Sequence, residues 1–167
     1  MINIYGKGGH AKVIESVLWN THPKQITFWD DESYEREVGE FDPYNNNIKG
    51  NWVIAIGNNK SRKRIAELLG NGCYIIMIHN SAIVNRNINP GEGSQILHNS
   101  VVQTGTTIGK HCIINTAASI DHDCILGDFS FIGPNATLCG GVEIGEGTFI
   151  GAGAVILPYI KIGKNCM

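Results

Sequence analysis

The chain has 167 residues, a formal net charge of −2 and a pI of about 6.3. This length is enough for one ordinary domain or two small ones. The near-neutral charge gives no electrostatic reason to bind nucleic acid or an anionic membrane. No apolar run approaches the ~20 residues that cross a bilayer, and the N-terminus lacks the basic-then-apolar pattern of a signal peptide. We therefore expect a cytoplasmic protein without membrane insertion.

The first half of the chain alternates strand-like and helix-like segments. Apolar spacing predicts strands at 2–6, 25–31, 52–59 and 73–79, and helices at 10–19 and 60–70. Strands separated by helices indicate βαβ units and a small parallel sheet. We assign residues 1–80 to an α/β, Rossmann-like domain.

The second half follows a period of six. The repeated position is aliphatic in twelve consecutive repeats: Ile96, Val102, Ile108, Ile114, Ile120, Leu126, Ile132, Leu138, Ile144, Ile150, Ile156 and Ile162. This period fits neither a helix nor an alternating strand, so it predicts a solenoid in which three hexapeptides close a triangular coil of about 18 residues. The aliphatic side chains would fill its interior. Glycine follows this position six times. We interpret these glycines as residues that adopt the positive φ of a sharp bend. We assign residues 81–167 to this domain, with its first coil opening around Pro90.

Both halves together resemble the sugar acyltransferases of the NeuD/PglD type. The resemblance is carried by YGKGGHAKVI at the start, by ILHNSVVQTGTTIGKHCIINTAASIDHDCILGDF and by the hexapeptides that follow. It implies an all-β left-handed parallel β-helix, here short at its C-terminal end, and assembly into a homotrimer. It also implies that acetyl-CoA binds along the β-helix as co-substrate. The N-terminal domain would hold a nucleotide-linked amino sugar, with UDP as the expected nucleotide.

The resemblance places the family's catalytic histidine–acid dyad at His122 and Asp123. Acyl transfer from a thioester to an amine needs a base, and histidine titrates near neutrality. His122 follows the interior Ile120 by two residues, which places it at or just past a corner of the coil. Asp121 is the less favoured partner, because adjacent residues on an extended segment point in opposite directions. Asp123 is also adjacent, so a turn has to bring its carboxylate round to the histidine.

The resemblance also implies acetyl-CoA-binding residues in the coil. Asn115 resembles a residue that contacts the thioester region, although an asparagine at a corner is also plain turn chemistry. Phe131 stands where close relatives carry a second histidine and would supply an aromatic contact instead. Gly151 and Ala152 would bind part of the pantetheine.

The predicted substrate-binding residues all follow strands of the N-terminal domain, at the edge where parallel strands end. They are Gly8, Gly9, His10, Asp30, Asp31, Gly57 and Asn58. Glycines at a helix N-terminus let backbone N–H groups approach a diphosphate, and acids after a strand can meet ribose hydroxyls. A simple turn is the alternative for the two acids. The GKGG turn departs from the dinucleotide pattern G-x-G-x-x-G, so we expect a nucleotide sugar rather than NAD(H).

The remaining histidines and the cysteines give no sign of a metal site. Five cysteines without C-x-x-C spacing favour neither a disulfide framework nor bound zinc. A zinc site of the carbonic anhydrase kind needs converging histidines, and the spacing of His98, His111 and His122 does not match whole coils of about 18 residues. We expect His98 and His111 at the surface or an interface, and Cys112 and Cys124 to be packing residues.

The expected function is transfer of an acetyl group from acetyl-CoA to the 4-amino group of a nucleotide-linked 4-amino-4,6-dideoxy sugar, in the biosynthesis of a surface polysaccharide or glycan. Direct attack by the amine, with His122 as general base, needs no covalent intermediate. Two alternatives stay open. One is O-acetylation of sialic acid or a related sugar, and the other is a non-catalytic trimeric sugar-nucleotide-binding protein with an incomplete donor site.

Overall fold

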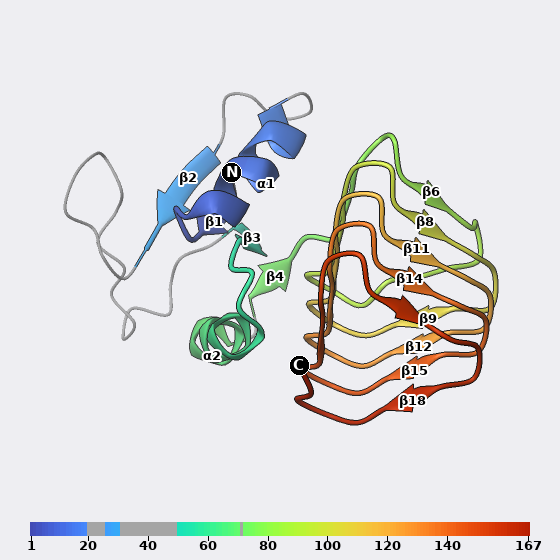
Figure 1. The fold of residues 1–167 in the computed structure, drawn as a ribbon. Coiled ribbons are helices and arrows are strands. Elements are labelled where there is room, and N and C mark those ends of the chain that lie inside the picture. Colours follow the sequence, from blue (N-terminus) through green and yellow to red (C-terminus); the bar gives the residue numbers. More distant parts are fainter. Residues whose placement is uncertain (20–25, 31–49, 71) are drawn as a thin grey trace. The chain divides into compact units, whose positions relative to one another are not determined.

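The structure is a computed structural model that describes residues 1–19, 26–30, 50–70 and 72–167. It divides into two compact units, Met1–Ile75 and Ile76–Met167 (Figure 1). The predicted substrate-binding residue Asp31 lies outside the described ranges. Within those ranges, no helix is long and apolar enough to cross a membrane.

The first unit contains a parallel sheet with the strand order β2-β1-β3-β4 and the helices α1 (Gly9–Trp19) and α2 (Asn59–Leu69). Its strands are β1 (Ile2–Tyr5), β2 (Ile26–Trp29), β3 (Asn51–Ile54) and β4 (Cys73–Tyr74). The central strand β1 is buried along its whole length, which is typical of a parallel strand covered on both faces. The α/β prediction is confirmed. The strands are shorter than the apolar segments from which they were predicted.

The strand predicted at 73–79 is in fact two strands that belong to different sheets. β4 pairs with β3, whereas β5 (Met77–Ile78) pairs with β7 (Gln95–Ile96) of the second unit. The coil therefore starts at Met77, not around Pro90 as predicted. The aliphatic position continues back to Val84 and Ile78, but Pro90 interrupts it, so the repeat was followed only from Ile96 onward.

The second unit is a parallel β-helix of two-residue strands arranged in three sheets (Figure 1). The strands after β5 are β6 (Ile83–Val84), β7 (Gln95–Ile96), β8 (Val101–Val102), β9 (Thr107–Ile108), β10 (Ile113–Ile114), β11 (Ser119–Ile120), β12 (Ile125–Leu126), β13 (Phe131–Ile132), β14 (Thr137–Leu138), β15 (Glu143–Ile144), β16 (Phe149–Ile150), β17 (Val155–Ile156) and β18 (Lys161–Ile162). We call β16-β13-β10-β7-β5 the first sheet, β17-β14-β11-β8-β6 the second and β18-β15-β12-β9 the third. Met77 pairs with Gln95 and Ile113 with Phe131, so one coil takes 18 residues, as the repeat predicted.

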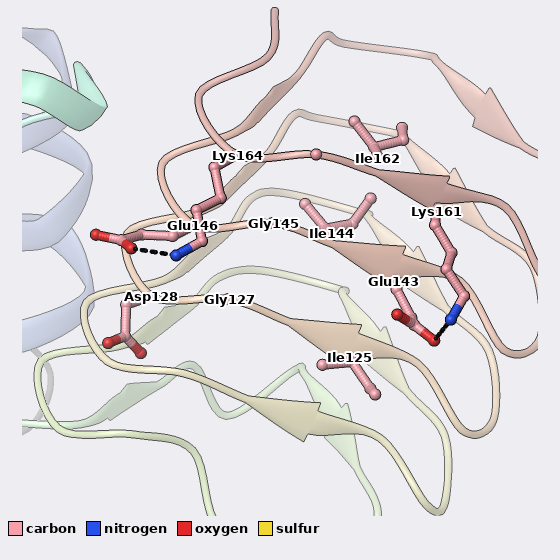
Figure 2. A pocket seen from close by; sticks show the side chains of 11 residues that line it. Ile125, Gly127, Asp128, Glu143, Ile144, Gly145, Glu146, Lys161, Ile162 and Lys164 are labelled. Atoms are coloured by element: carbon pink, nitrogen blue, oxygen red, sulfur yellow. Dashed lines mark ion pairs between the residues drawn. The ribbon is translucent and has the colours of Figure 1, made fainter.

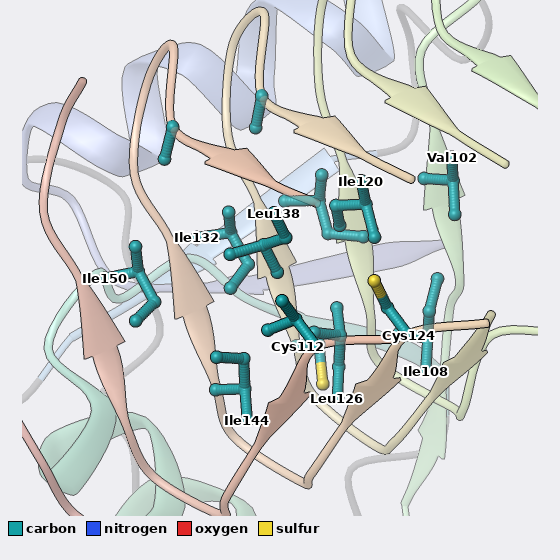
Figure 3. Close-up of a cluster of buried hydrophobic side chains, with 14 of the residues drawn as sticks. Val102, Ile108, Cys112, Ile120, Cys124, Leu126, Ile132, Leu138, Ile144 and Ile150 are labelled. Atoms are coloured by element: carbon teal, nitrogen blue, oxygen red, sulfur yellow. The ribbon is translucent and has the colours of Figure 1, made fainter. Parts of the chain in front are cut away.

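The aliphatic positions of the repeat form the interior of this β-helix (Figure 3). Ile96, Ile114, Ile120, Ile132 and Leu138 have no exposed surface. Small residues such as Ala118 and Ala136 fill the space between them. In a solenoid each coil covers the interior of its neighbours. The predicted core is therefore confirmed.

The corners use a left-handed backbone conformation at a different position from the one predicted. The residues with positive φ stand three places after the aliphatic position; those other than glycine are Asn99, His111, Ala117, Asp123, Phe129, Asn135, Tyr159 and Asn165, with φ between 53° and 61°. The glycine directly after the aliphatic position has another role. A Cβ at Gly127 would lie 2.6 Å from the backbone nitrogen of Glu146, and one at Gly133 would lie 2.7 Å from that of Ala152. These glycines permit close approach between coils.

Candidate functional site

The loop that joins β11 to β12 carries the predicted dyad at the corner between the second and third sheets. His122 Nδ1 and Asp123 Oδ2 are 2.8 Å apart. Asp123 has φ of 57°, and this left-handed turn lets its carboxylate reach the adjacent ring. Asp121 instead accepts a hydrogen bond from the backbone N–H of His122 through Oδ1, at 2.8 Å. The geometry therefore selects Asp123 as the partner of the imidazole.

The two carboxylates of this loop stabilise the protonated form of the His122 imidazole. The hydrogen bond to Asp123, and after it the charge of Asp121, raise the pKa of His122 above its ordinary value. Both dyad side chains are solvent-exposed, His122 by 49% and Asp123 by 71%. With Nδ1 held by the carboxylate, Nε2 is the ring nitrogen that can accept a proton from a bound molecule.

Two glycines on neighbouring coils make room for the dyad. A Cβ at Gly140 would lie 2.6 Å from His122 Nε2 and 2.7 Å from Cε1. A Cβ at Gly105 would overlap Asp123 Oδ1. Sequence reasoning missed both residues. The signal was available, because Gly140 stands one coil of 18 residues after His122 and Gly105 one coil before Asp123.

Three of the four predicted donor-binding residues lie at a different corner from the dyad. Asn115 lies between β10 and β11, where its Oδ1 accepts a hydrogen bond from the backbone N–H of Thr116 at 2.8 Å. Gly151 and Ala152 lie two coils further on, at the same corner between the first and second sheets, and are exposed. Within one chain the structure brings these three residues to one corner and His122 to another.

Phe131 lies on a face that the dyad does not share. It belongs to β13 in the first sheet, and its ring stacks on Phe149 with centroids 4.5 Å apart and planes 8° apart. The two residues are ladder partners in neighbouring strands, and only 8% of Phe131 is exposed. The structure thus gives Phe131 a packing partner and does not bring it to His122.

In the first unit, the predicted glycine turn and acid meet where the parallel strands end. The backbone N–H of Lys7 donates to Asp30 Oδ2 at 2.9 Å, which joins the end of β2 to the turn after β1. A Cβ added at Gly8, Gly9 or Gly57 would meet no atom within 4 Å. The backbone is therefore open to a ligand at these three positions.

Two further residues shape the same edge of the sheet. Asn58 caps α2, since its Oδ1 accepts from the backbone of the first turn, so its side chain has a structural role. Arg62, unnoticed in the sequence, is fully buried and donates through Nη1 to the carbonyls of Ile56 at 3.0 Å and Gly57 at 3.1 Å. It fixes the loop that carries Gly57. His10 is the second residue of α1 and is partly buried.

A groove of about 640 Å³ lies on the third sheet and does not include the dyad (Figure 2). Lys161 pairs with Glu143 at 2.7 Å, and Lys164 with Glu146 at 3.5 Å. Exposed ion pairs of this kind contribute up to about 1 kcal/mol of stability. We assign this groove no catalytic part.

The other histidines and cysteines do not form a second reactive centre. Within residues 1–19, 26–30, 50–70 and 72–167, no group of three or more His, Cys, Asp or Glu could hold a metal ion. His98 stacks on His79 with centroids 3.7 Å apart. His111, predicted at the surface or an interface, is 4% exposed and stacks on Phe129 with ring centroids 4.9 Å apart. Burial raises the pKa of the Cys124 thiol, as expected for a packing residue.

Two family models match the chain. The model described as the PglD N-terminal domain matches residues 1–69. The model of the bacterial transferase hexapeptide, which spans six repeats, matches residues 123–158 and 141–167.

Curated relatives and solved structures extend the match over both units. GDP-perosamine N-acetyltransferase of Escherichia coli O157:H7 is 30% identical over 93% of this chain and 77% of its own length. UDP-N-acetylbacillosamine N-acetyltransferase of Bacillus subtilis (strain 168) is 36% identical over 58% of this chain and 50% of its own length. The acetyltransferase domain of PglB from Neisseria gonorrhoeae FA1090, solved with acetyl coenzyme A, has a TM-score of 0.87 at 32% identity, covering 98% of this chain and 84% of its own. PerB from Caulobacter crescentus, solved with CoA and GDP-perosamine, has a TM-score of 0.86 at 31% identity, covering 98% of this chain and 83% of its own.

Proposed function

Because the chain belongs to the family of PglD-type sugar acetyltransferases with a left-handed β-helix, we propose that it transfers the acetyl group of acetyl-CoA to the 4-amino group of a nucleotide-linked 4-amino-4,6-dideoxy sugar. The relatives named for GDP-perosamine and for UDP-N-acetylbacillosamine support a nucleotide-linked amino sugar as acceptor. The observation that carries the mechanism is the 2.8 Å contact between His122 Nδ1 and Asp123 Oδ2.

The proposed reaction is a direct acyl transfer with His122 as general base. The amine nitrogen attacks the thioester carbonyl carbon while His122 Nε2 accepts its proton, and a C–N bond forms as the C–S bond breaks. The leaving thiolate takes the proton back from the imidazolium. Asp123 orients the ring and stabilises its protonated form. The raised pKa of His122 makes the imidazole a stronger base, and the ring has to be neutral at the start of each turnover to act as one.

The separation of the two corners supports a shared site between copies of the chain. Asn115, Gly151 and Ala152 lie between the first and second sheets, whereas His122 lies between the second and third. A site that uses all four residues needs two different corners to meet. Side-by-side packing of three β-helices achieves this when each copy supplies its base to a donor on its neighbour. A homotrimer is therefore part of the proposal.

The edge of the sheet in the first unit at which the parallel strands end is the proposed site for the nucleotide. Gly8 precedes α1 and Gly9 is its first residue, and the space beside both is open. A diphosphate can therefore approach their backbone N–H groups at the helix N-terminus. Asp30 lies beside the same turn, where a carboxylate can accept from ribose hydroxyls. UDP and GDP both contain the diphosphate and the ribose that these contacts involve, so both nucleotides fit the proposed site.

The cysteines among the described residues are free, which fits a reducing cytoplasm.

A thiol-release assay tests this function. Purified protein is mixed with acetyl-CoA and a panel of UDP-, GDP- and dTDP-linked 4-amino sugars, with sialic acid as a hydroxyl acceptor. We expect release of CoA thiol with an amino sugar, a rate about 10²–10⁴-fold lower in His122→Ala, and a normal rate in the control His98→Ala. Release with sialic acid alone would favour O-acetylation. Tight nucleotide-sugar binding without release would favour a non-catalytic binding protein.

A further inference from the structure

The loop that carries the dyad is held at both ends by one buried hydroxyl. Thr106 Oγ1 donates to the backbone carbonyl of Asp121 at 2.9 Å and accepts from the backbone N–H of Cys124 at 3.2 Å. Thr106 is 5% exposed and lies one coil before Cys124. Its hydroxyl therefore bridges the first and last residues of the loop from Asp121 to Cys124, with both dyad residues between them.

Two backbone hydrogen bonds to neighbouring coils hold the middle of the loop. The backbone N–H of Asp123 donates to the carbonyl of Thr104 at 3.0 Å, and the carbonyl of His122 accepts from the N–H of Gly141 at 2.9 Å. These are the ordinary ladder bonds between coils. The Thr106 hydroxyl adds a side-chain bond to each end of the loop, where the direction of the turn is set.

The chain contains the same hydroxyl bridge at a corner far along the coil from the dyad. Thr148 Oγ1 donates to the carbonyl of Gly163 at 2.6 Å and accepts from the N–H of Cys166 at 3.1 Å. Alanine occupies the equivalent small position at Ala118 and Ala136, both fully buried. The coil thus folds with or without the hydroxyl. The bridge is an addition at particular corners, and at Thr106 that corner carries the dyad.

We propose that Thr106 is a positioning residue for the His122–Asp123 dyad, an inference that rests on the proposed function of His122. The left-handed conformation of Asp123 belongs to the corner itself, and the hydroxyl bridge fixes the two loop ends between which His122 and Asp123 are held. A displacement of about 1 Å at a catalytic group is enough to lower a rate on the order of 10²-fold. The charged groups facing His122 are Asp121 and Asp123 of its own loop, and the neighbouring coils contribute Thr104, Gly105 and Gly140, which are uncharged.

Three variants of the full chain test this role. Thr106→Val removes the hydroxyl at nearly constant volume, Thr106→Ser restores it, and Thr148→Val removes the matched bridge away from the dyad. Thr106→Val leaves the N–H of the buried Cys124 without the hydroxyl, whereas Thr148→Val affects Gly163 and Cys166, which are exposed, so we expect Tm to fall more in Thr106→Val. We expect kcat to fall about tenfold or more in Thr106→Val, with the KM values unchanged, and to stay near wild type in Thr106→Ser and Thr148→Val. If Thr106→Val does not fold, Thr106→Ala replaces it.

A titration of His122 by NMR provides a readout that is independent of turnover. In Thr106→Val the midpoint should move toward that of an ordinary imidazole, because the contact with Asp123 loosens. It should not move in Thr148→Val. Equal kcat and equal His122 titration in the two valine variants would overturn the positioning role. A wild-type protein inert toward every acceptor would overturn the proposed function instead, and the titration would still decide whether Thr106 positions the dyad.

Discussion

Asp123 reaches His122 because its backbone adopts the left-handed conformation that recurs at the corners of the coil. This conformation costs a residue other than glycine about 1–2 kcal/mol, although Asp tolerates it better than most. The ladder hydrogen bond from its N–H to Thr104 fixes the conformation. The fold thus supplies the turn that an adjacent histidine–acid pair needs, and a residue pattern alone could not show it.

Removal of the Asp123 charge should shift the pH dependence of the reaction. In the folded protein Asp123 raises the pKa of His122, so the base is protonated up to a higher pH. We expect Asp123→Asn to move the acidic limb of the kcat/KM profile to lower pH. The plateau should fall, because the imidazolium formed during transfer loses its counter-charge. Profiles of both enzymes check this. A limb that stays in place or moves to higher pH would contradict the pairing.

Gly140 should be required for activity more than for folding. An alanine there places a Cβ 2.6 Å from His122 Nε2, so the exposed ring has to move while the backbone stays. We expect kcat of Gly140→Ala to fall about tenfold or more, with a small change in Tm. The control is Gly163→Ala, whose Cβ has its nearest neighbour at 3.9 Å. Equal kcat in the two variants would show that the ring does not depend on this space.

The six-residue repeat predicted the coil because an aliphatic side chain fills the interior at the same position of every hexapeptide from Ile96 onward. Periodicity located the interior from Ile96 onward, where each aliphatic side chain is covered by the coils on both sides. It failed before Ile96, because Pro90 interrupts the aliphatic position and separates Ile78 and Val84 from the later repeats. It also misplaced the left-handed residues, because a glycine needed for close approach looks the same in sequence as a glycine needed for positive φ.

The position of an aliphatic residue along the β-helix should determine its contribution to stability. Ile132 is fully buried between coils, whereas Ile162 lies in the last described coil and is only partly buried. We expect Ile132→Ala to cost about 2–5 kcal/mol in the free energy of unfolding and Ile162→Ala clearly less. Urea denaturation followed by circular dichroism measures both. Equal losses would contradict a core built by coverage from neighbouring coils.

At the scale of the whole molecule, the two units divide the proposed chemistry between nucleotide binding and acyl transfer. The sequence predicted this division, since strand–helix alternation and a six-residue period are different patterns. The predicted glycine turn and Asp30 do lie together at one edge of the sheet in the first unit, where Lys7 donates to Asp30. The support behind that edge was not predictable, because a buried Arg62 looks in sequence like one more charge on an exposed helix.

The acid at this edge should affect the sugar nucleotide and not the acetyl donor. Asp30→Asn keeps an oxygen for the N–H of Lys7 and removes the negative charge. We expect the KM for the nucleotide sugar to rise about tenfold, as when a charge-assisted hydrogen bond is lost, with the KM for acetyl-CoA unchanged. The control Glu67→Gln changes an exposed acid on α2. An equal rise for both substrates would contradict the proposed division.

The most direct test of the central claim is to identify the product. The protein is incubated with acetyl-CoA and the preferred nucleotide-linked 4-amino sugar, and the purified product is examined by mass spectrometry and NMR. We predict one acetyl group, bound as an acetamide at the 4-position, formed about 10²–10⁴-fold more slowly by the His122→Ala protein. An acetyl ester on a hydroxyl, or an acetamide formed equally by the His122→Ala protein, would contradict it.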